Sequence, residues 1–193
     1  MKPQRDDASW TAVESDRASL AELQAFYEAN PEYWLLVYGR APERDEAERD
    51  FDAAPAAEMS YSALKAWLIR DCTSRRVIGE LSAVVDLLAP GVMHLGFFII
   101  DAARQGTGLA HEVYESYEAW SVGQGARWMR LGAVESNARG WSFWRRHGYV
   151  EVRRRDGYVL GDRSHTLIVM VKPIAPSTLD DYLARVVRDR PES

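Results

Sequence analysis

The chain has 193 residues, of which 47% are hydrophobic and 27% charged, and this mix is typical of a soluble globular protein. The length favours one domain over residues 1–193, and the net charge of −5 at pH 7 argues against a protein built mainly to bind nucleic acid. The single cysteine, Cys72, excludes an internal disulfide and fits a reducing compartment such as the cytoplasm. No apolar run reaches membrane-spanning length, and residues 1–8 lack the apolar core of a signal peptide.

The first sixty residues are predicted to form a short strand followed by helices. Residues 10–13 read as the strand, and a helix begins near Asp16 and ends near Asn30, because a proline follows and disfavours helix in the residue before it. Residues 33–38 are apolar and aromatic, and periodicity does not decide between helix and extended chain there. Residues 42–51 are rich in Glu, Asp and Ala and predict an acidic helix.

Three apolar segments follow, at residues 64–70, 77–87 and 93–100, with polar turns between them. Such short connections predict an antiparallel meander. Gly96 interrupts the third segment at its middle, and a glycine inside a strand is typical of a β-bulge.

A longer helix begins near Thr107 and ends at the glycines that follow residue 122. Residues 128–134 read as a strand, and because a helix connects it to the preceding strand, that pair should be parallel. The remaining predicted elements are a helix over 138–147, a hairpin of strands over 150–154 and 166–171 with turns at 156–157 and 161–162, and a last helix over 179–187.

A glycine-rich stretch connects the third apolar strand to the longer helix. It reads Gln105-Gly106-Thr107-Gly108-Leu109-Ala110. Its glycines tolerate positive φ and let a ligand approach the backbone, while the first amides of the helix lack partners and favour an anion such as phosphate. The spacing does not fit a P-loop, which needs Lys and Ser/Thr after the last glycine, or a Rossmann turn, which needs a third glycine where His111 stands.

With its downstream residues, this stretch resembles the GNAT superfamily of acyl-CoA-dependent N-acyltransferases. That family has Gln/Arg-x-x-Gly-x-Gly/Ala between its fourth strand and third helix, an Asn after its fifth strand, and Gly-Phe or Gly-Tyr at the end of the next helix. The matching residues here are Gln105, Gly108, Ala110, Asn137 and Gly148-Tyr149. The resemblance covers about residues 60–173 and is looser before them.

The resemblance implies an α/β (α+β) fold of GNAT type. Its central mixed, mostly antiparallel sheet would have about six or seven strands, with helices on both faces and an additional C-terminal helix. It also implies acetyl-CoA as co-substrate and no metal ion. The implied cofactor-binding residues are Gln105, the amides of Gly106, Thr107, Gly108, Leu109 and Ala110, the strand backbone of Phe98 and Ile100, and Asn137. Asn137 is equally a residue that caps helices, and both roles can coexist.

A base must take a proton from the acceptor, because an ammonium has no lone pair with which to attack a thioester. His94 stands where some family members place a catalytic Glu, and histidine titrates near neutral pH, although a strand-end histidine can also simply face solvent. Glu80 is the rival candidate, since an acid inside an apolar strand lies either on a solvated face or in a cleft. Glu135 is a third, weaker candidate.

The family's usual acid is a Tyr seven residues after the Asn, and this chain has Trp144 there. The indole N–H does not ionise usefully, so that role cannot be carried over. Trp144 is instead expected to wall the thioester end of the cofactor, Tyr149 is expected to pack in the core, and the thiolate would take its proton from water or from the acceptor ammonium.

Charge is divided unevenly along the chain. Arg139 and Arg145 are expected to contact the 3′-phosphate of the cofactor, and residues 153–155 are expected to form a solvated basic face. The first sixty residues are acidic, and the resemblance implies that they border the acceptor cleft, which favours a cationic acceptor.

The function that these observations favour is transfer of an acetyl group from acetyl-CoA to a primary amine of a small molecule or peptide. Direct attack in a ternary complex is expected, because no residue stands out as a covalent nucleophile. The alternative is a non-catalytic acyl-CoA-binding or regulatory module on the same fold. The expected partners include neither nucleic acid nor membrane, and seven tryptophans with a spare terminal helix suggest a homodimer surface.

Overall fold

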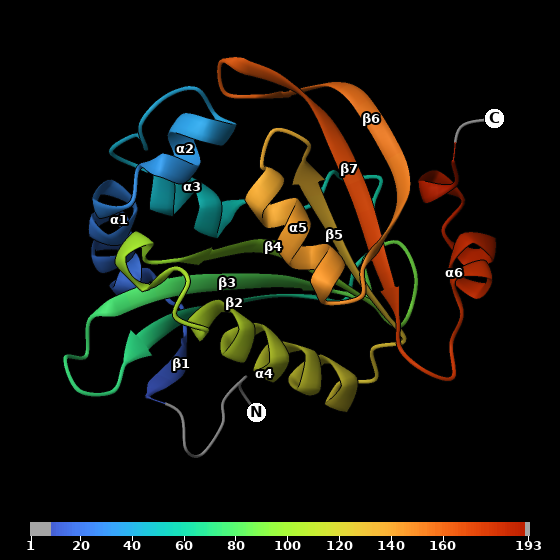
Figure 1. Ribbon diagram of the computed structural model, residues 1–193, viewed down its shortest axis with the longest axis horizontal. Coiled ribbons are helices and arrows are strands. Elements are labelled where there is room, and N and C mark those ends of the chain that lie inside the picture. Colours follow the sequence, from blue (N-terminus) through green and yellow to red (C-terminus); the bar gives the residue numbers. More distant parts are fainter. Residues whose placement is uncertain (1–8, 192–193) are drawn as a thin grey trace.

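The computed structural model describes residues 9–191, so the expectation for residues 1–8 lies outside the described residues. Seven strands form one sheet in the order β1-β2-β3-β4-β5-β7-β6 (Figure 1). The strands are β1 (Trp10–Glu14), β2 (Ala63–Asp71), β3 (Val77–Val85), β4 (Val92–Ile100), β5 (Trp128–Val134), β6 (Val150–Leu160) and β7 (Arg163–Pro173). The α-helices are α1 (Leu20–Ala29), α2 (Glu32–Val37), α3 (Glu46–Asp52), α4 (Leu109–Gly123), α5 (Ala138–Arg146) and α6 (Leu179–Arg185).

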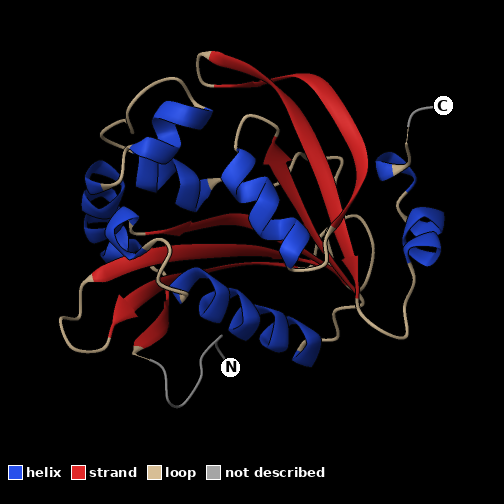
Figure 2. Cartoon of the chain, viewed as in Figure 1, coloured by secondary structure: helices blue, strands red, loops and turns tan. Residues whose placement is uncertain are grey.

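All neighbouring strands run antiparallel except β4 and β5, which are parallel, and this confirms the predicted mixed sheet. Helices cover both of its faces (Figure 2). Successive strand residues point to opposite sides of the sheet, so one strand can supply apolar side chains to both layers of helices. On β2, Trp67 and Ile69 pack with α4 and α5, whereas Leu68 packs with α1 and α2. The terminal helix α6 packs against β5, where Trp128 contacts Tyr182.

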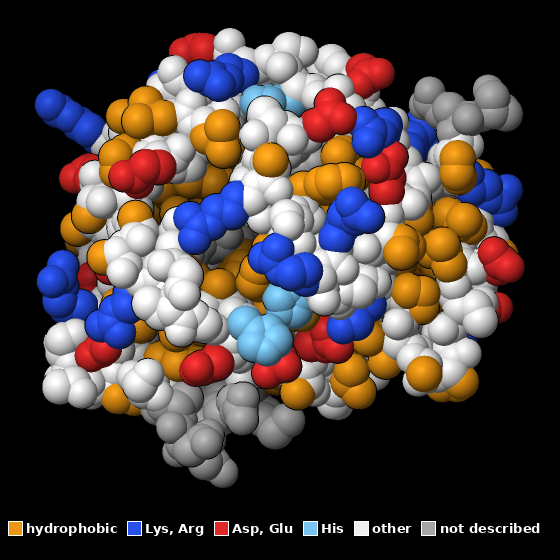
Figure 3. Space-filling view, viewed as in Figure 1, with side chains coloured by type: hydrophobic (Ala, Val, Ile, Leu, Met, Phe, Trp, Pro, Cys, Tyr) orange, Lys and Arg blue, Asp and Glu red, His pale blue; other side chains and the backbone are white. Residues whose placement is uncertain are grey.

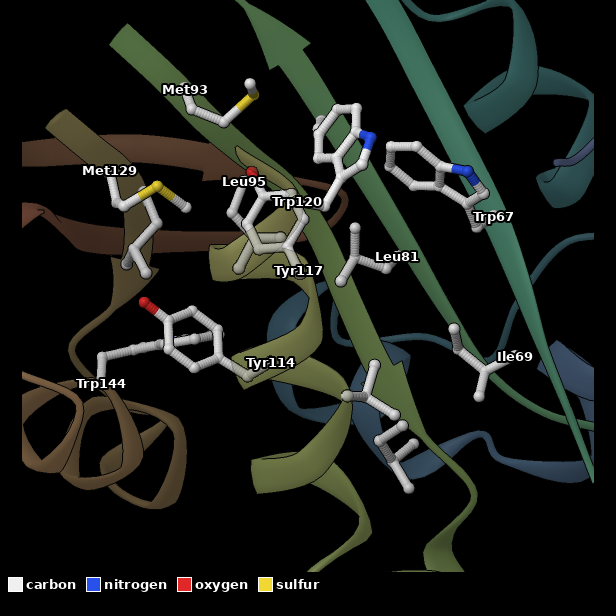
Figure 4. Packing of buried hydrophobic residues seen from close by; sticks show 14 of the residues in the cluster. Trp67, Ile69, Leu81, Met93, Leu95, Tyr114, Tyr117, Trp120, Met129 and Trp144 are labelled. Carbon is white, nitrogen blue, oxygen red and sulfur yellow. The ribbon is translucent and has the colours of Figure 1, made fainter. Parts of the chain in front are cut away.

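The larger core lies between α4 and the sheet (Figure 4). Trp120 on α4 meets Trp67 on β2 edge-on, with the ring centroids 4.8 Å apart. Leu109, Val113 and Tyr117 are also buried, as their helical spacing on one face of α4 favours.

A β-bulge at Gly96 separates β4 from β5. Ser82 of β3 pairs with Phe97 and Ala83 pairs with Leu95, so Gly96 is an additional residue in β4 and the predicted bulge is confirmed. The parallel ladder with β5 covers only Val92–Leu95. Beyond the bulge, the edge of β4 that faces β5 is therefore paired with no strand among residues 9–191.

Two segments were predicted incompletely or wrongly. Residues 33–38 were left open between helix and extended chain, and α2 covers Glu32–Val37. Asp156-Gly157 is not a turn but an irregular part of the longer strand β6, and the hairpin turns at Gly161-Asp162.

Across residues 9–191, no helix is both long enough and apolar enough to cross a lipid bilayer.

Candidate active site

The glycine-rich turn between β4 and α4 presents its backbone to open space. Gly106 and Gly108 have φ of 83° and 95°, which side chains rarely adopt, and a Cβ on either would meet no atom within 4 Å. Gly108 is the N-cap of α4 and has no side chain to cap the helix, and the Thr107 hydroxyl accepts a long hydrogen bond of 3.4 Å from the Leu109 amide. The first amides of α4 have no intrahelical partners, and an anion can accept hydrogen bonds from them.

A cleft of about 520 Å³ opens at this turn. Figure 3 shows the same face hollowed near its middle, with Lys and Arg side chains beside the hollow. The predicted cofactor-binding residues that line the cleft are Phe98, Ile100, Gln105, Gly106, Gly108, Ala110, Asn137 and Trp144. Thr107 and Leu109 lie in the same turn but do not line the cleft; the Thr107 hydroxyl donates to the Arg104 carbonyl.

The open edge of β4 offers backbone groups to the cleft. The amide of Asp101 donates to the Ile78 carbonyl at 2.9 Å, so this residue pair is hydrogen-bonded across β3 and β4. Because such pairs alternate in an antiparallel ladder, the N–H and C=O groups of Phe98 and Ile100 point away from β3, toward the gap. The Gln105 side-chain amide donates to the Ile100 carbonyl at 3.1 Å, which agrees with this orientation. An extended ligand with amide groups can bind such an edge by strand addition.

Helix α5 forms the opposite wall, and Asn137 begins it. The Asn137 side chain accepts a hydrogen bond from the Gly140 amide at 2.9 Å, which confirms the predicted cap. Trp144, one face of which packs in the core, is 9% exposed and lies with ring centroids 5.8 Å from Phe98 and 5.5 Å from Tyr114. Tyr149 is buried, as predicted.

Basic side chains gather where the turn meets α5. Arg139 donates to the side-chain oxygen of Gln105, and Arg146 also lines the cleft. Arg145, expected here from the sequence, instead stacks over Trp141 at 4.7 Å and is not part of the lining. His111 lines the cleft as well, bonded at 2.8 Å to His147. Sequence reasoning missed Arg146 and the histidine pair, because no motif marks them.

The arginines at 153–155 do not form a free basic face. Arg154 is paired with Glu151 at 2.7 Å, and Arg155 is paired with the fully buried Asp189 at 3.1 Å. That interpretation was wrong for Arg154 and Arg155, because their guanidinium groups are paired with acids, and Arg153 donates to the Arg188 carbonyl.

His94 lies outside the cleft lining, at the start of β4. Its Nδ1 is 3.2 Å from the guanidinium of Arg130, which is itself ion-paired with buried Asp189 at 2.7 Å. Removal from water, together with the Arg130 charge, lowers the pKa of His94 to about 3. The imidazole is therefore a weak base in this structure.

Glu80 is buried beneath α1, with 5% of its surface exposed. The Tyr27 hydroxyl donates to its carboxyl group at 2.5 Å. Burial raises the pKa of Glu80 to about 8, and the nearby Asp50 carboxylate acts in the same direction. Glu80 is not itself in the cleft lining, but its cross-strand partner Ile99 is.

The structure does not bring the two predicted base candidates together. Glu80 pairs with Ile99 and Val84 pairs with His94, so the candidates are four residues apart along the ladder, roughly 13 Å. Glu135, the third candidate, is exposed and held by Arg154.

Helix α2 closes the remaining side of the cleft through Glu32, Tyr33 and Leu36. This helix is fixed to the β6–β7 hairpin, whose tip lies beside it (Figure 1). Three successive carbonyls, those of Leu36, Val37 and Tyr38, accept hydrogen bonds from β7 or its turn. The donors are the Arg163 guanidinium at 3.2 Å, the His165 imidazole at 2.6 Å and the Asp162 amide at 2.9 Å, respectively.

The model of the acetyltransferase (GNAT) family matches residues 23–149. This range begins within α1 and ends just after α5. The chain belongs to this family. The matched segment contains the glycine-rich turn, the bulged β4 and the Asn137 cap, so the GNAT resemblance noted in the sequence is confirmed. No curated protein matches the chain.

Solved structures show the same fold at low identity. An acetyltransferase from Thermus thermophilus is 20% identical, with a TM-score of 0.69, over 86% of this chain and 98% of the other. A spermidine N-acetyltransferase from Vibrio cholerae, in complex with CoA and spermine, is 15% identical, with a TM-score of 0.65, over 86% and 95%. A ribosomal-protein-S5-alanine acetyltransferase from Vibrio fischeri is 11% identical, with a TM-score of 0.69, over 90% and 98%.

Proposed function

We propose that this GNAT protein transfers an acetyl group from acetyl-CoA to a primary amine, by direct attack in a ternary complex. The observation that carries the proposal is that a single cleft joins three surfaces: the glycine-rich turn at the start of α4, the open edge of β4 and the wall formed by α2. The first two suit the phosphates and the amide-containing arm of acetyl-CoA. The third leaves room for an acceptor beside the acyl group.

The cofactor would be held mainly by backbone groups. Gly106 and Gly108 supply the open turn for the pyrophosphate, and Phe98 and Ile100 supply the strand edge for the pantetheine arm. Arg139 and the neighbouring Arg146 add positive charge for the phosphates at the same end of the cleft.

In the reaction, the neutral amine nitrogen attacks the acyl carbon, a C–N bond forms and the C–S bond breaks. The amine proton passes to a base, and the departing thiolate takes a proton from water or from the acceptor. Glu80 suits the role of base better than His94, because a pKa of about 8 allows proton exchange near neutral pH whereas a pKa of about 3 does not. A water between Glu80 and the acceptor would complete the route past Ile99.

The second candidate function is a non-catalytic acyl-CoA-binding module. Trp144 at the position of the usual acid favours it, since an indole cannot protonate a thiolate. A thiol-release assay distinguishes the two functions. With acetyl-CoA and a panel of amines, amino acids and peptides, the enzyme releases CoA and yields an acetylated amine detectable by mass spectrometry. A binding module retains acetyl-CoA and releases no thiol with any acceptor.

A further inference from the structure

The acceptor end of the cleft is predominantly apolar. Tyr33 and Leu36 are three positions apart on α2, so they lie on one face of the helix, and both line the cleft. The ring of Tyr33 packs edge-on against Phe97 of β4 at 5.1 Å, which fixes it as part of the wall. Leu35, between them, is 48% exposed and lies outside the lining.

Little negative charge borders this end. Among the described residues that line the cleft, Glu32 is the only acid. The acidic rim expected from the first sixty residues is therefore reduced to one carboxylate. Several other acids of that segment are paired with arginines of the chain, three of them at the surface, namely Glu22 with Arg70, Glu43 with Arg49 and Asp52 with Arg17, whereas Glu46, paired with Arg40, is buried.

The wall is also held in place. The carbonyls of Leu36, Val37 and Tyr38 are bonded to the β6–β7 hairpin, and His165, which makes the shortest of these contacts, is 8% exposed. A helix anchored at successive carbonyls cannot easily shift to admit a differently shaped ligand. The apolar surface of Tyr33 and Leu36 is therefore presented as a preformed binding surface.

We propose that the acceptor is a primary monoamine with an aliphatic or aromatic group close to the nitrogen, which packs on Tyr33 and Leu36. This inference rests on the proposed acetyl transfer and specifies its acceptor class. A polyamine fits poorly, because a second ammonium would lie against the apolar surface of Tyr33 and Leu36, with Glu32 the one carboxylate among the described lining residues. The same chemistry can come from a free arylalkylamine or from a peptide that begins with an apolar residue.

The test compares kcat/KM values for 2-phenylethylamine, for a tripeptide with N-terminal Phe and for spermidine, all with acetyl-CoA and the full chain. We expect one of the first two to exceed spermidine by about tenfold or more, because apolar contact in a pocket discriminates by roughly 10–200-fold. Which of the two is preferred identifies the source of the amine. A wild-type protein that prefers spermidine would overturn the inference while leaving acetyl transfer intact.

Two substitutions on neighbouring positions sharpen the test. Leu36→Glu places a carboxylate in the apolar wall and should lower kcat/KM for the preferred monoamine about tenfold while narrowing its advantage over spermidine. Leu35→Glu makes the same chemical change on the exposed side of α2 and should leave both values unchanged. Acetyl-CoA affinity, measured by calorimetry, reports that both variants are folded, and Leu36→Ala provides a milder change at the same site.

Equal effects of the two Glu substitutions on acceptor preference, with acetyl-CoA affinity retained, would overturn the inference. Absence of turnover with every amine, with acetyl-CoA still bound, would instead refute the proposed acetyl transfer itself and the acceptor class with it.

Discussion

At the proposed cofactor end of this GNAT cleft, the surface offered to a ligand is backbone, whereas at the proposed acceptor end it is formed by side chains. The turn at Gly106 and Gly108 and the edge of β4 beyond Gly96 expose amides and carbonyls. The wall of α2 exposes Tyr33 and Leu36. A site built from backbone groups recognises a chemical group that all ligands of the family share, and the glycines that it requires are visible in the sequence. A site built from side chains can differ between proteins that act on different acceptors, without a change of fold.

Disruption of the turn should have the largest effect. Gly108→Glu places a negative side chain at a position with φ of 95°, in the proposed phosphate site, so we expect acetyl-CoA binding to be lost in calorimetry. Gly125→Glu is the matched control, because Gly125 has φ of 91° and an equally open surrounding just beyond the other end of α4. If the two variants bind acetyl-CoA alike while folded, the cofactor is not held at this turn.

Removal of the proposed base should have the next largest effect. Glu80→Gln should lower kcat/KM by ~10²–10⁴-fold near neutral pH, as is usual for general-base catalysis. The loss should grow toward pH 8, where Glu80 becomes ionised, and should shrink at higher pH, because more of the acceptor is then already neutral. His94→Gln serves as the comparison and should keep the wild-type pH–rate profile. Wild-type profiles in both variants would exclude both residues as the base.

The same carboxyl should make stability depend on pH. Since burial raises the pKa of Glu80 from 4.5 to about 8, the folded state holds a proton that the unfolded state has lost between these values. Its contribution to the free energy of unfolding is therefore full below pH 4.5 and falls as pH rises toward 8. Glu80→Gln should flatten this decline in denaturant titrations at pH 5 and pH 8. If the free energy of unfolding falls equally between pH 5 and pH 8 in the variant and in the wild type, Glu80 is not held protonated.

The features built from backbone groups could be predicted from the sequence, whereas those built from contacts between distant side chains could not. Gly96, Gly108 and Asn137 act through local backbone geometry, so their spacing predicted the bulge, the turn and the cap. The α2 wall depends on bonds between Val37 and His165, 128 positions apart, and no local pattern reports such a contact. The environment of His94 was equally hidden, because it depends on an ion pair with the C-terminal segment.

Loss of an anchor of α2 should have a moderate effect confined to the acceptor. His165→Ala leaves the Val37 carbonyl without its donor, and we expect the acceptor KM to rise roughly tenfold while acetyl-CoA affinity is kept. Ser164→Ala, at the exposed neighbouring position on β7, should change neither value. An equal loss of acetyl-CoA affinity in His165→Ala would mean that the two ends of the cleft are not independent.

The smallest effect is expected at Trp144. Trp144→Phe retains an aromatic wall beside Phe98 and should keep most activity, whereas Trp144→Ala should weaken acetyl-CoA binding through lost packing. Steady-state kinetics of the two variants measure the difference. Inactivity of Trp144→Phe comparable to that of Gly108→Glu would show that the indole N–H is required.

The central claim is that one cleft holds acetyl-CoA and an amine together, so that the acetyl group passes directly between them. Initial velocities measured while both substrates are varied test it most directly, with the acetylated amine identified by mass spectrometry. We predict double-reciprocal lines that intersect, as a ternary complex requires. Parallel lines would indicate an acetylated enzyme intermediate, and no acetylated amine with any acceptor would show that the cleft binds acetyl-CoA without catalysis; either result would contradict the account.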